Sequence, residues 1–255
     1  MVIGFLVDAL IWKKSLKIFN LSTTLTDAYI SVGLSVFMKY IPGKVMSILG
    51  RSAYIANKKE VSLFLVSTSS ILQQILILWA GLFVGFLIFI NPDFSFVWSL
   101  VSLLFLFFFT IFIIYPNSFL LLLKIYSKIS SFKPELSNLS TGKIVRTLPL
   151  CLLFWLTSGF AFYFYVSSIL TQDIPFLLFA GFPLATSLAI ITIIAPGGLG
   201  IREGILFSIL ILFNIPAAEA TMISITSRLW FILGEALTFF LALFLKVVMK
   251  VPAPN

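Results

Sequence analysis

The sequence has no histidine, only one cysteine and few charged residues. Histidine is the commonest metal ligand and the usual general base near neutral pH, so its absence removes many enzyme classes. The single Cys151 excludes an internal disulfide and a cysteine-rich metal site, and it reads as a small buried hydrophobe. No phosphate-binding P-loop, no Gly-x-Ser-x-Gly motif and no metal-ligand cluster is present. We therefore expect no metal and no cofactor, and no recognisable motif favours an enzyme.

Charged residues make up 10% of the chain, whereas soluble domains carry about 25%. Hydrophobic residues make up 60%, and the mean hydropathy is +1.15. This composition predicts an all-α, polytopic integral membrane protein. Lysine and arginine number 17 against 9 acidic residues. In a membrane protein such an excess indicates loops beside anionic lipid headgroups. We expect membrane lipids as partners and no nucleic acid.

Long apolar runs predict membrane spans over residues 61–90, 96–123, 147–170 and 220–245. The first apolar run, Met1–Trp12, is about 18 Å long as a helix. That is too short for about 30 Å of hydrocarbon. It belongs either to a longer helix or to an interfacial one, and Asp8 within it is expected at the interface.

Basic residues are concentrated in four stretches, 13–17, 58–59, 124–146 and 246–250. The positive-inside rule assigns these stretches to the cytoplasm. The turns at Asp93, Asp173 and Glu219 lack nearby basic residues and are expected outside. The chain should therefore lie in the cell membrane as a multi-pass protein, with the loop 124–146 and the C-terminus cytoplasmic.

Two Pro-Gly breaks interrupt membrane-like sequence: KYIPGKVMSILGR at Lys39–Arg51 and IIAPGGLGIREG at Ile193–Gly204. Interrupted backbone cannot face lipid, because its N–H and C=O groups would lack partners. By charge, residues 18–57 and 176–215 each return to the side from which they entered, from opposite faces. This pattern predicts two broken, re-entrant helix pairs in an inverted repeat. Ordinary hairpins with proline kinks are the alternative.

The repeat divides a single transmembrane domain, residues 1–255, into two halves. The first half covers about 1–123, the basic loop covers 124–146, and the second half covers about 147–250. In each half the order is a span, a broken pair and a second span.

Charged side chains near the bilayer centre are costly, so they persist where they face a cavity or a partner. We predict a cationic pocket between the two broken pairs. Arginine suits phosphate because its planar fork donates two parallel hydrogen bonds, and a helix beginning at Leu199–Arg202 would add free N–H groups. The predicted binding residues are Arg202, Arg51, Arg228, Lys44, Gly197, Gly198 and Gly200, and the predicted supporting residues are Glu203, Glu235, Gln73, Gln74, Pro42, Gly43 and Pro196.

Glu203 and Glu235 are expected to pair with arginines, with Arg228 or Arg202 as the partner of Glu235. Structural roles remain open for these residues. The acids and arginines can simply tie helices together, Arg51 and Lys44 can reach the cytoplasmic interface, and the glutamines can join helices by hydrogen bonds.

The two breaks resemble a known family. Pro42, Gly43, Lys44 and Arg51, followed by PGGLGIREG at Pro196–Gly204, resemble the transmembrane region of lysylphosphatidylglycerol synthetases, which also occurs in stand-alone flippase-like membrane proteins. The resemblance spans about residues 10–245. It implies a lipid-handling module without the soluble aminoacyl-transferase domain that the synthetases carry.

Three functions are compatible with these observations. The first is a flippase-like transporter that moves an anionic phospho- or glycolipid headgroup through the cationic pocket. The second is an intramembrane transferase acting on a lipid phosphate. The third is a non-transporting partner of a glycosyltransferase. A polyprenyl-linked lipid and a homodimer also remain open.

Overall fold

The structure is a computed structural model, and it describes residues 2–41, 45–90, 96–115, 141–192 and 198–249. Every regular element in these ranges is helical. The elements are α1 (Val2–Ile18), α2 (Leu25–Ser35), η1 (Val36–Tyr40), α3 (Val45–Lys59), α4 (Leu63–Gly85), η2 (Phe86–Ile90), α5 (Phe96–Ile114), α7 (Thr141–Val145), α8 (Leu148–Ser167), η3 (Phe176–Ala180), α9 (Gly181–Ile191), α10 (Ile201–Leu212) and α11 (Ala217–Val248). The chain is therefore an all-α helical bundle, as predicted.

Within the described ranges, three helical stretches are long and apolar enough to cross a membrane: Leu63–Phe89, Thr141–Ser167 and Ala217–Val248. They match three of the four predicted spans. In the fourth, the described helix α5 ends at Ile114, and its apolar stretch Ser99–Ile114 is shorter than a full span. The rest of that predicted span, and the predicted loop up to residue 140, lie outside the described residues.

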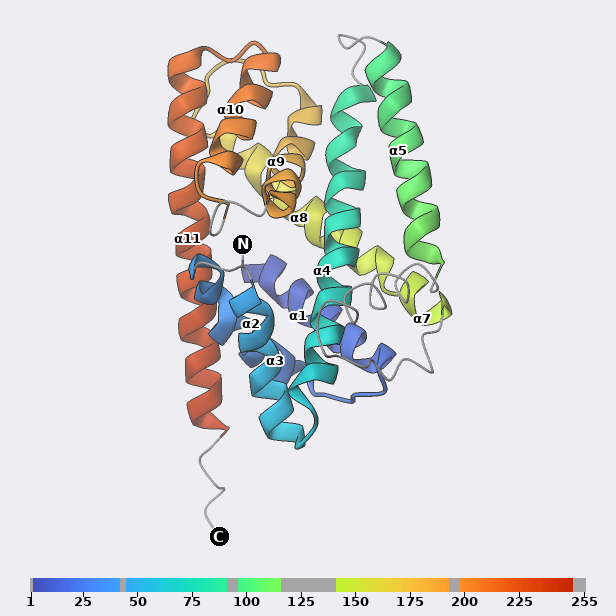
Figure 1. Cartoon of the computed structure of the whole chain (residues 1–255). Helices are drawn as coiled ribbons and strands as arrows, with labels where there is room; N and C mark the ends of the chain where they lie inside the picture. The colour runs from blue at the N-terminus through green and yellow to red at the C-terminus, as the bar shows by residue number, and fades with distance from the viewer. Residues whose placement is uncertain (1, 42–44, 91–95, 116–140, 193–197, 250–255) are drawn as a thin grey trace.

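Both predicted breaks interrupt helices, and the two broken pairs pack in a reciprocal way (Figure 1). Helix α2 packs on α3 in the first pair, and α9 packs on α10 in the second. Helices α2 and α3 contact α11 and α4 respectively, whereas α9 and α10 contact α4 and α11. Exchanging the two halves of the chain reproduces these contacts. This reciprocity is what an inverted repeat requires, and it favours the repeat over unrelated hairpins.

A close glycine contact occurs in each of the two reciprocal interfaces, α2 with α11 and α4 with α9. A Cβ at Gly33 of α2 would lie 2.4 Å from the Cβ of Ala242 and 2.9 Å from the main-chain oxygen of Thr238, both on α11. A Cβ at Gly85 of α4 would lie 2.7 Å from the Cα of Leu184 on α9. Small residues let membrane helices approach closely without a hydrophobic driving force. Here they seat each broken pair on the long helix of the opposite half.

Helix α1 lies in the core of the bundle. It packs on α2, α4 and α8, and Ile11, Trp12 and Leu16 are fully buried. Its helix continues through the lysines to Ile18. This run therefore covers apolar surface on three other helices, and its depth relative to the membrane interface stays a prediction. The expectation that Asp8 lies at the interface is wrong, since Asp8 is only 7% exposed.

The open end of the first broken pair is closed by an ion pair. Lys58, in the last turn of α3, donates to Asp27, in the first turn of α2. Burial opposes ionisation of Asp27, but the hydrogen bonds from Lys58 and Thr24 outweigh it and hold the pKa of this carboxyl below its usual value. The bond holds the two helix ends together.

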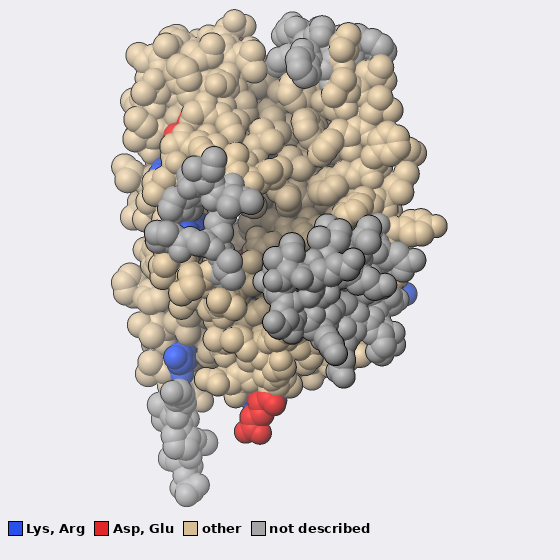
Figure 2. Space-filling view, in the orientation of Figure 1, with Lys and Arg blue, Asp and Glu red and all other residues tan. Residues whose placement is uncertain are grey.

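The outer surface of the bundle is mainly apolar. Large hydrophobic side chains are exposed along α5 and α11, among them Phe107, Phe108, Leu233, Leu237 and Phe244. In Figure 2 the face on view is mainly uncharged, with small charged patches along its left side, at its right edge and at its lower end, and it is hollowed near its middle. Such a surface is suited to lipid.

Candidate functional site

A cavity of about 360 Å³ lies between the two broken pairs. Its walls come from α1, α2, η1, α3 and α4 on one side and from α8, α9, the start of α10 and α11 on the other. Four charged residues line it: Asp8, Lys39, Arg51 and Arg202. Because both halves contribute walls and cations, the cavity occupies the place at which the sequence predicted a cationic pocket.

Arg202 enters the cavity from the second residue of α10. The residue is 5% exposed, and its guanidinium lies 5.3 Å from the ring centroid of Phe182 and 5.5 Å from that of Phe231. Its Nε lies 3.5 Å from Oε1 of Glu203. Its Nη2 is buried and has no hydrogen-bond partner among the described residues. A buried guanidinium donor without a partner is costly, and its geometry is suited to an anion.

Glu203 organises the start of α10. Its Oε2 accepts from the main-chain N–H of Gly200 at 2.7 Å, and its Oε1 accepts from Nη1 of Arg228 at 2.7 Å. Gly200 and Gly198 have φ of +80° and +71°, which glycine adopts without strain. Helix α10 begins at Ile201, as predicted. Arg228 is therefore held by Glu203 and does not line the cavity.

Arg51 of α3 lines the cavity and belongs to a chain of hydrogen bonds that links it through Gln73 to Asp8. Its Nη1 donates to Oε1 of Gln73 at 3.0 Å, and Nε2 of Gln73 donates to Oδ1 of Asp8. Gln73 is fully buried and Arg51 is 8% exposed. The alternative in which Arg51 reaches the interface is therefore wrong. The Nε of Arg51 has no partner among the described residues, so this arginine also keeps a donor free.

Glu235 is fully buried on α11, but its predicted arginine partner is wrong. Lys39 of η1 forms an ion pair with Oε1, and the hydroxyl of Tyr40 donates to Oε2 at 2.9 Å. Arg228 and Arg202 are turned toward Glu203 instead. The predicted partners, Arg228 and Arg202, lie in the same half of the chain as Glu235, whereas its actual partner, Lys39, comes from the other half.

The predicted residues divide into three groups. Arg202, Arg51, Gly198 and Gln74 line the cavity. Behind its wall lie Arg228, Glu203, Glu235 and Gln73, which hold one another or the lining residues, and Gly200 lies at the start of α10. Pro42, Gly43, Lys44, Pro196 and Gly197 lie outside the described residues.

The sequence did not single out four residues that line the cavity, Asp8, Lys39, Phe182 and Phe231, or Tyr40, which donates to Glu235 outside the lining. A signal existed for Lys39 and Tyr40, because a lysine and a tyrosine directly before a break in an apolar segment need a partner. The two phenylalanines could not be told apart from the other aromatic residues. Among the described residues, no group of three or more acidic or cysteine side chains could hold a metal.

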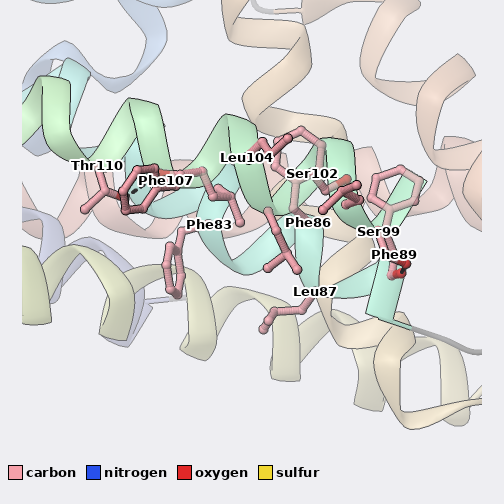
Figure 3. A pocket seen from close by; sticks show the side chains of 12 residues that line it. Phe83, Phe86, Leu87, Phe89, Ser99, Ser102, Leu104, Phe107 and Thr110 are labelled. Atoms are coloured by element: carbon pink, nitrogen blue, oxygen red, sulfur yellow. Dashed lines mark hydrogen bonds between the residues drawn. The ribbon is translucent and has the colours of Figure 1, made fainter. Parts of the chain in front are cut away.

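A second hollow of about 530 Å³ lies between α4, η2 and α5 (Figure 3). Phenylalanine and leucine side chains form most of its walls. The hydroxyl of Ser99 donates to the main-chain oxygen of Phe89, and that of Thr110 accepts from Nε1 of Trp79 at 3.0 Å. Since these hydroxyls are used within the protein, the groove presents hydrocarbon and differs in kind from the charged cavity.

The fold and the cavity together define a polytopic α-helical membrane protein with two broken helix pairs around a buried cationic site. The chain belongs to the family described as the lysylphosphatidylglycerol synthase TM region, which matches residues 1–234. Membership associates the chain with membrane lipids. Comparison with curated proteins and with solved structures gave no match.

Proposed function

We propose that this protein moves the anionic headgroup of a lipid across the membrane through the cavity between its broken pairs. The observation that carries the proposal is the pair of free donors. Nη2 of Arg202 and Nε of Arg51 are buried, belong to opposite broken pairs, and have no partner among the described residues. A phosphate oxygen at each donor would complete the hydrogen bonding of both guanidinium groups.

The surroundings of the cations favour a headgroup over a whole lipid. The cavity is small and combines charged residues with aromatic walls, whereas the outer surface of α5 and α11 is apolar. A headgroup can enter the cavity while its tails remain against the outer surface. Broken segments from two inverted halves are the arrangement in which transporters place a substrate site.

The two alternatives have less support. A lipid-phosphate transferase needs an acid or base beside the anion, and Asp8 is the only acid among the described residues that line the cavity. A purely structural partner of another protein would be expected to fill its core and to pair its buried arginines. The cavity and the free donors of Arg51 and Arg202 argue against that role.

The test is a lipid-movement assay with purified protein in proteoliposomes. Fluorescent phosphatidylglycerol, phosphatidylcholine and a labelled polyprenyl phosphate are offered separately, and dithionite reports the fraction in the outer leaflet. We expect movement of at least one anionic lipid, its loss in R202A, and retention in R146A, which removes an exposed arginine outside the cavity. Equal rates for R202A and the wild type would overturn the proposed site. No movement of any lipid by the wild type would overturn the transport function.

A further inference from the structure

Three acids lie in or near the cavity, Asp8, Glu203 and Glu235, and their carboxylates accept hydrogen bonds from different kinds of group. Glu203 accepts directly from Arg228, and Glu235 accepts directly from Lys39. Asp8 forms no ion pair among the described residues. Its carboxylate accepts from the amide of Gln73, and Arg51 reaches it only through that amide. Asp8 is thus the one acid of the three without a direct cation, and it is the one that lines the cavity.

We propose that Asp8 takes up one proton when an anionic headgroup binds at Arg51, so that lipid and proton move together. This inference rests on the proposed function and specifies how transport is driven. In the empty state, Arg51 balances Asp8 across Gln73. A phosphate at Arg51 supplies that arginine with a closer negative charge. Asp8 then faces an additional anion in a poorly solvated cavity, and protonation removes the repulsion.

The bridge through Gln73 can survive this change. Its Nε2 donates to the carboxylate of Asp8 and also lies 3.3 Å from the main-chain oxygen of the same residue. When the carboxyl is protonated, the amide retains the main-chain acceptor. The proton comes from the buffered aqueous phase, through water that enters with the headgroup, and it returns to the aqueous phase when the anion leaves. No other co-reactant is required.

The neighbouring titratable groups indicate that Asp8 is the residue that accepts the proton. Burial opposes ionisation of Asp8, whereas Arg51 from α3 and Lys39 from η1 favour it, and the thiol of Cys151 on α8 interacts electrostatically with its carboxyl. Two other acids on helices packed against α1 have cations: Glu235 on α11 pairs with Lys39, and Asp27 on α2 pairs with Lys58. Glu219, in the first turn of α11, does not line the cavity. The remaining titratable groups on these packed helices are Tyr29 of α2, Tyr163 and Tyr165 of α8, Glu219, Arg228 and Lys246 of α11, and Lys143 of α7, with Lys13, Lys14 and Lys17 on α1 itself.

Proton uptake is measured first by binding. Calorimetry with dihexanoylphosphatidylglycerol in two buffers of different ionisation enthalpy counts the protons taken up for each lipid bound. We expect a value near one for the wild type in the pH range where Asp8 titrates, with affinity rising up to about tenfold for each unit of falling pH. D8N should take up none, and D173N, which changes an exposed acid, should match the wild type.

Proteoliposomes that contain a pH-sensitive dye give the second measurement. Proton entry should accompany lipid movement by the wild type and by D173N, and movement should accelerate in the direction of an imposed proton gradient. D8N should lose both responses. If D8N is unstable, the wild-type proton count still decides. Lipid bound or moved without any proton would overturn this inference and leave the proposed function intact. A wild type that neither binds nor moves lipid would overturn both.

Discussion

Lys39 and Glu235 form an ion pair between the two halves of the chain. Lys39 lies in η1, immediately before the first break, and Glu235 lies in the middle of α11. The other ion pairs in the described ranges, those of Lys58, Arg202 and Arg228, each stay within one half. The segment η1, next to the first break, is therefore held to the second half of the chain by the buried carboxylate of Glu235.

The two partners of this ion pair should respond differently to removal. The side chain of Lys39 is 32% exposed, whereas that of Glu235 is fully buried. K39M leaves a buried carboxylate with only Tyr40, so it should cost about 3 kcal/mol or more of unfolding free energy. E235Q should cost less, because Lys39 can turn toward the cavity. Unfolding in detergent measures both, and K39M/E235Q should recover much of the loss. Additive losses in the double variant would contradict the pairing.

The free donors of Arg202 predict a graded response to its replacement. R202K keeps the charge but loses the planar fork, so lipid movement should fall to an intermediate rate. R202A should abolish movement while the protein remains folded by circular dichroism. Full activity of R202K would show that only the positive charge matters. It would contradict bidentate binding of the anion by Nε and Nη2 of Arg202, the two buried donors without a hydrogen-bond partner among the described residues.

The reciprocal glycine contacts predict matched losses of stability. G33A and G85A place a methyl group against α11 and α9 respectively, at 2.4 Å and 2.7 Å from the nearest atoms. Each should destabilise the protein by about 1–3 kcal/mol. The control is G204A in α10, where a Cβ meets nothing within 4 Å, and it should be neutral or slightly stabilising. Thermal unfolding in detergent compares the three. A neutral G33A or G85A would contradict the close approach at that interface.

The re-entrant arrangement predicts that both ends of the second broken pair lie on one side of the membrane. Thr171 and Asn214 are exposed and flank α9 and α10, and the native Cys151 is buried. Cysteines at both positions should react with an impermeant maleimide in intact cells. A cysteine at Asn57, at the exposed end of α3, should react only after permeabilisation. Opposite labelling of Thr171 and Asn214 would contradict the inverted repeat.

Most of the architecture could be predicted because it depends on local composition. Apolar length gives the spans, and proline with glycine marks a backbone that cannot continue as a lipid-facing helix. The predicted helix start within Leu199–Arg202 was confirmed, because the features that begin α10 are local: the positive φ of Gly200 and the carboxylate of Glu203 act within four residues. Arg202 and Arg51 also follow the breaks directly, so their approach to one cavity was predicted from position.

The partners within the site could not be predicted because they join distant parts of the chain. Asp8 and Gln73 are 65 residues apart, and Lys39 and Glu235 are 196 apart. Separation along the sequence does not determine which buried charges pair, and the two predicted partners of Glu235, Arg228 and Arg202, were both wrong. Once the helices pack, Glu203 holds Arg228, and η1 brings Lys39 to Glu235. The sequence alone determined an apolar helical bundle with a basic net charge and two helices interrupted at Pro-Gly. The tertiary structure decided which cations are neutralised and which face the cavity, because pairing of buried charges depends on distances that only packing sets.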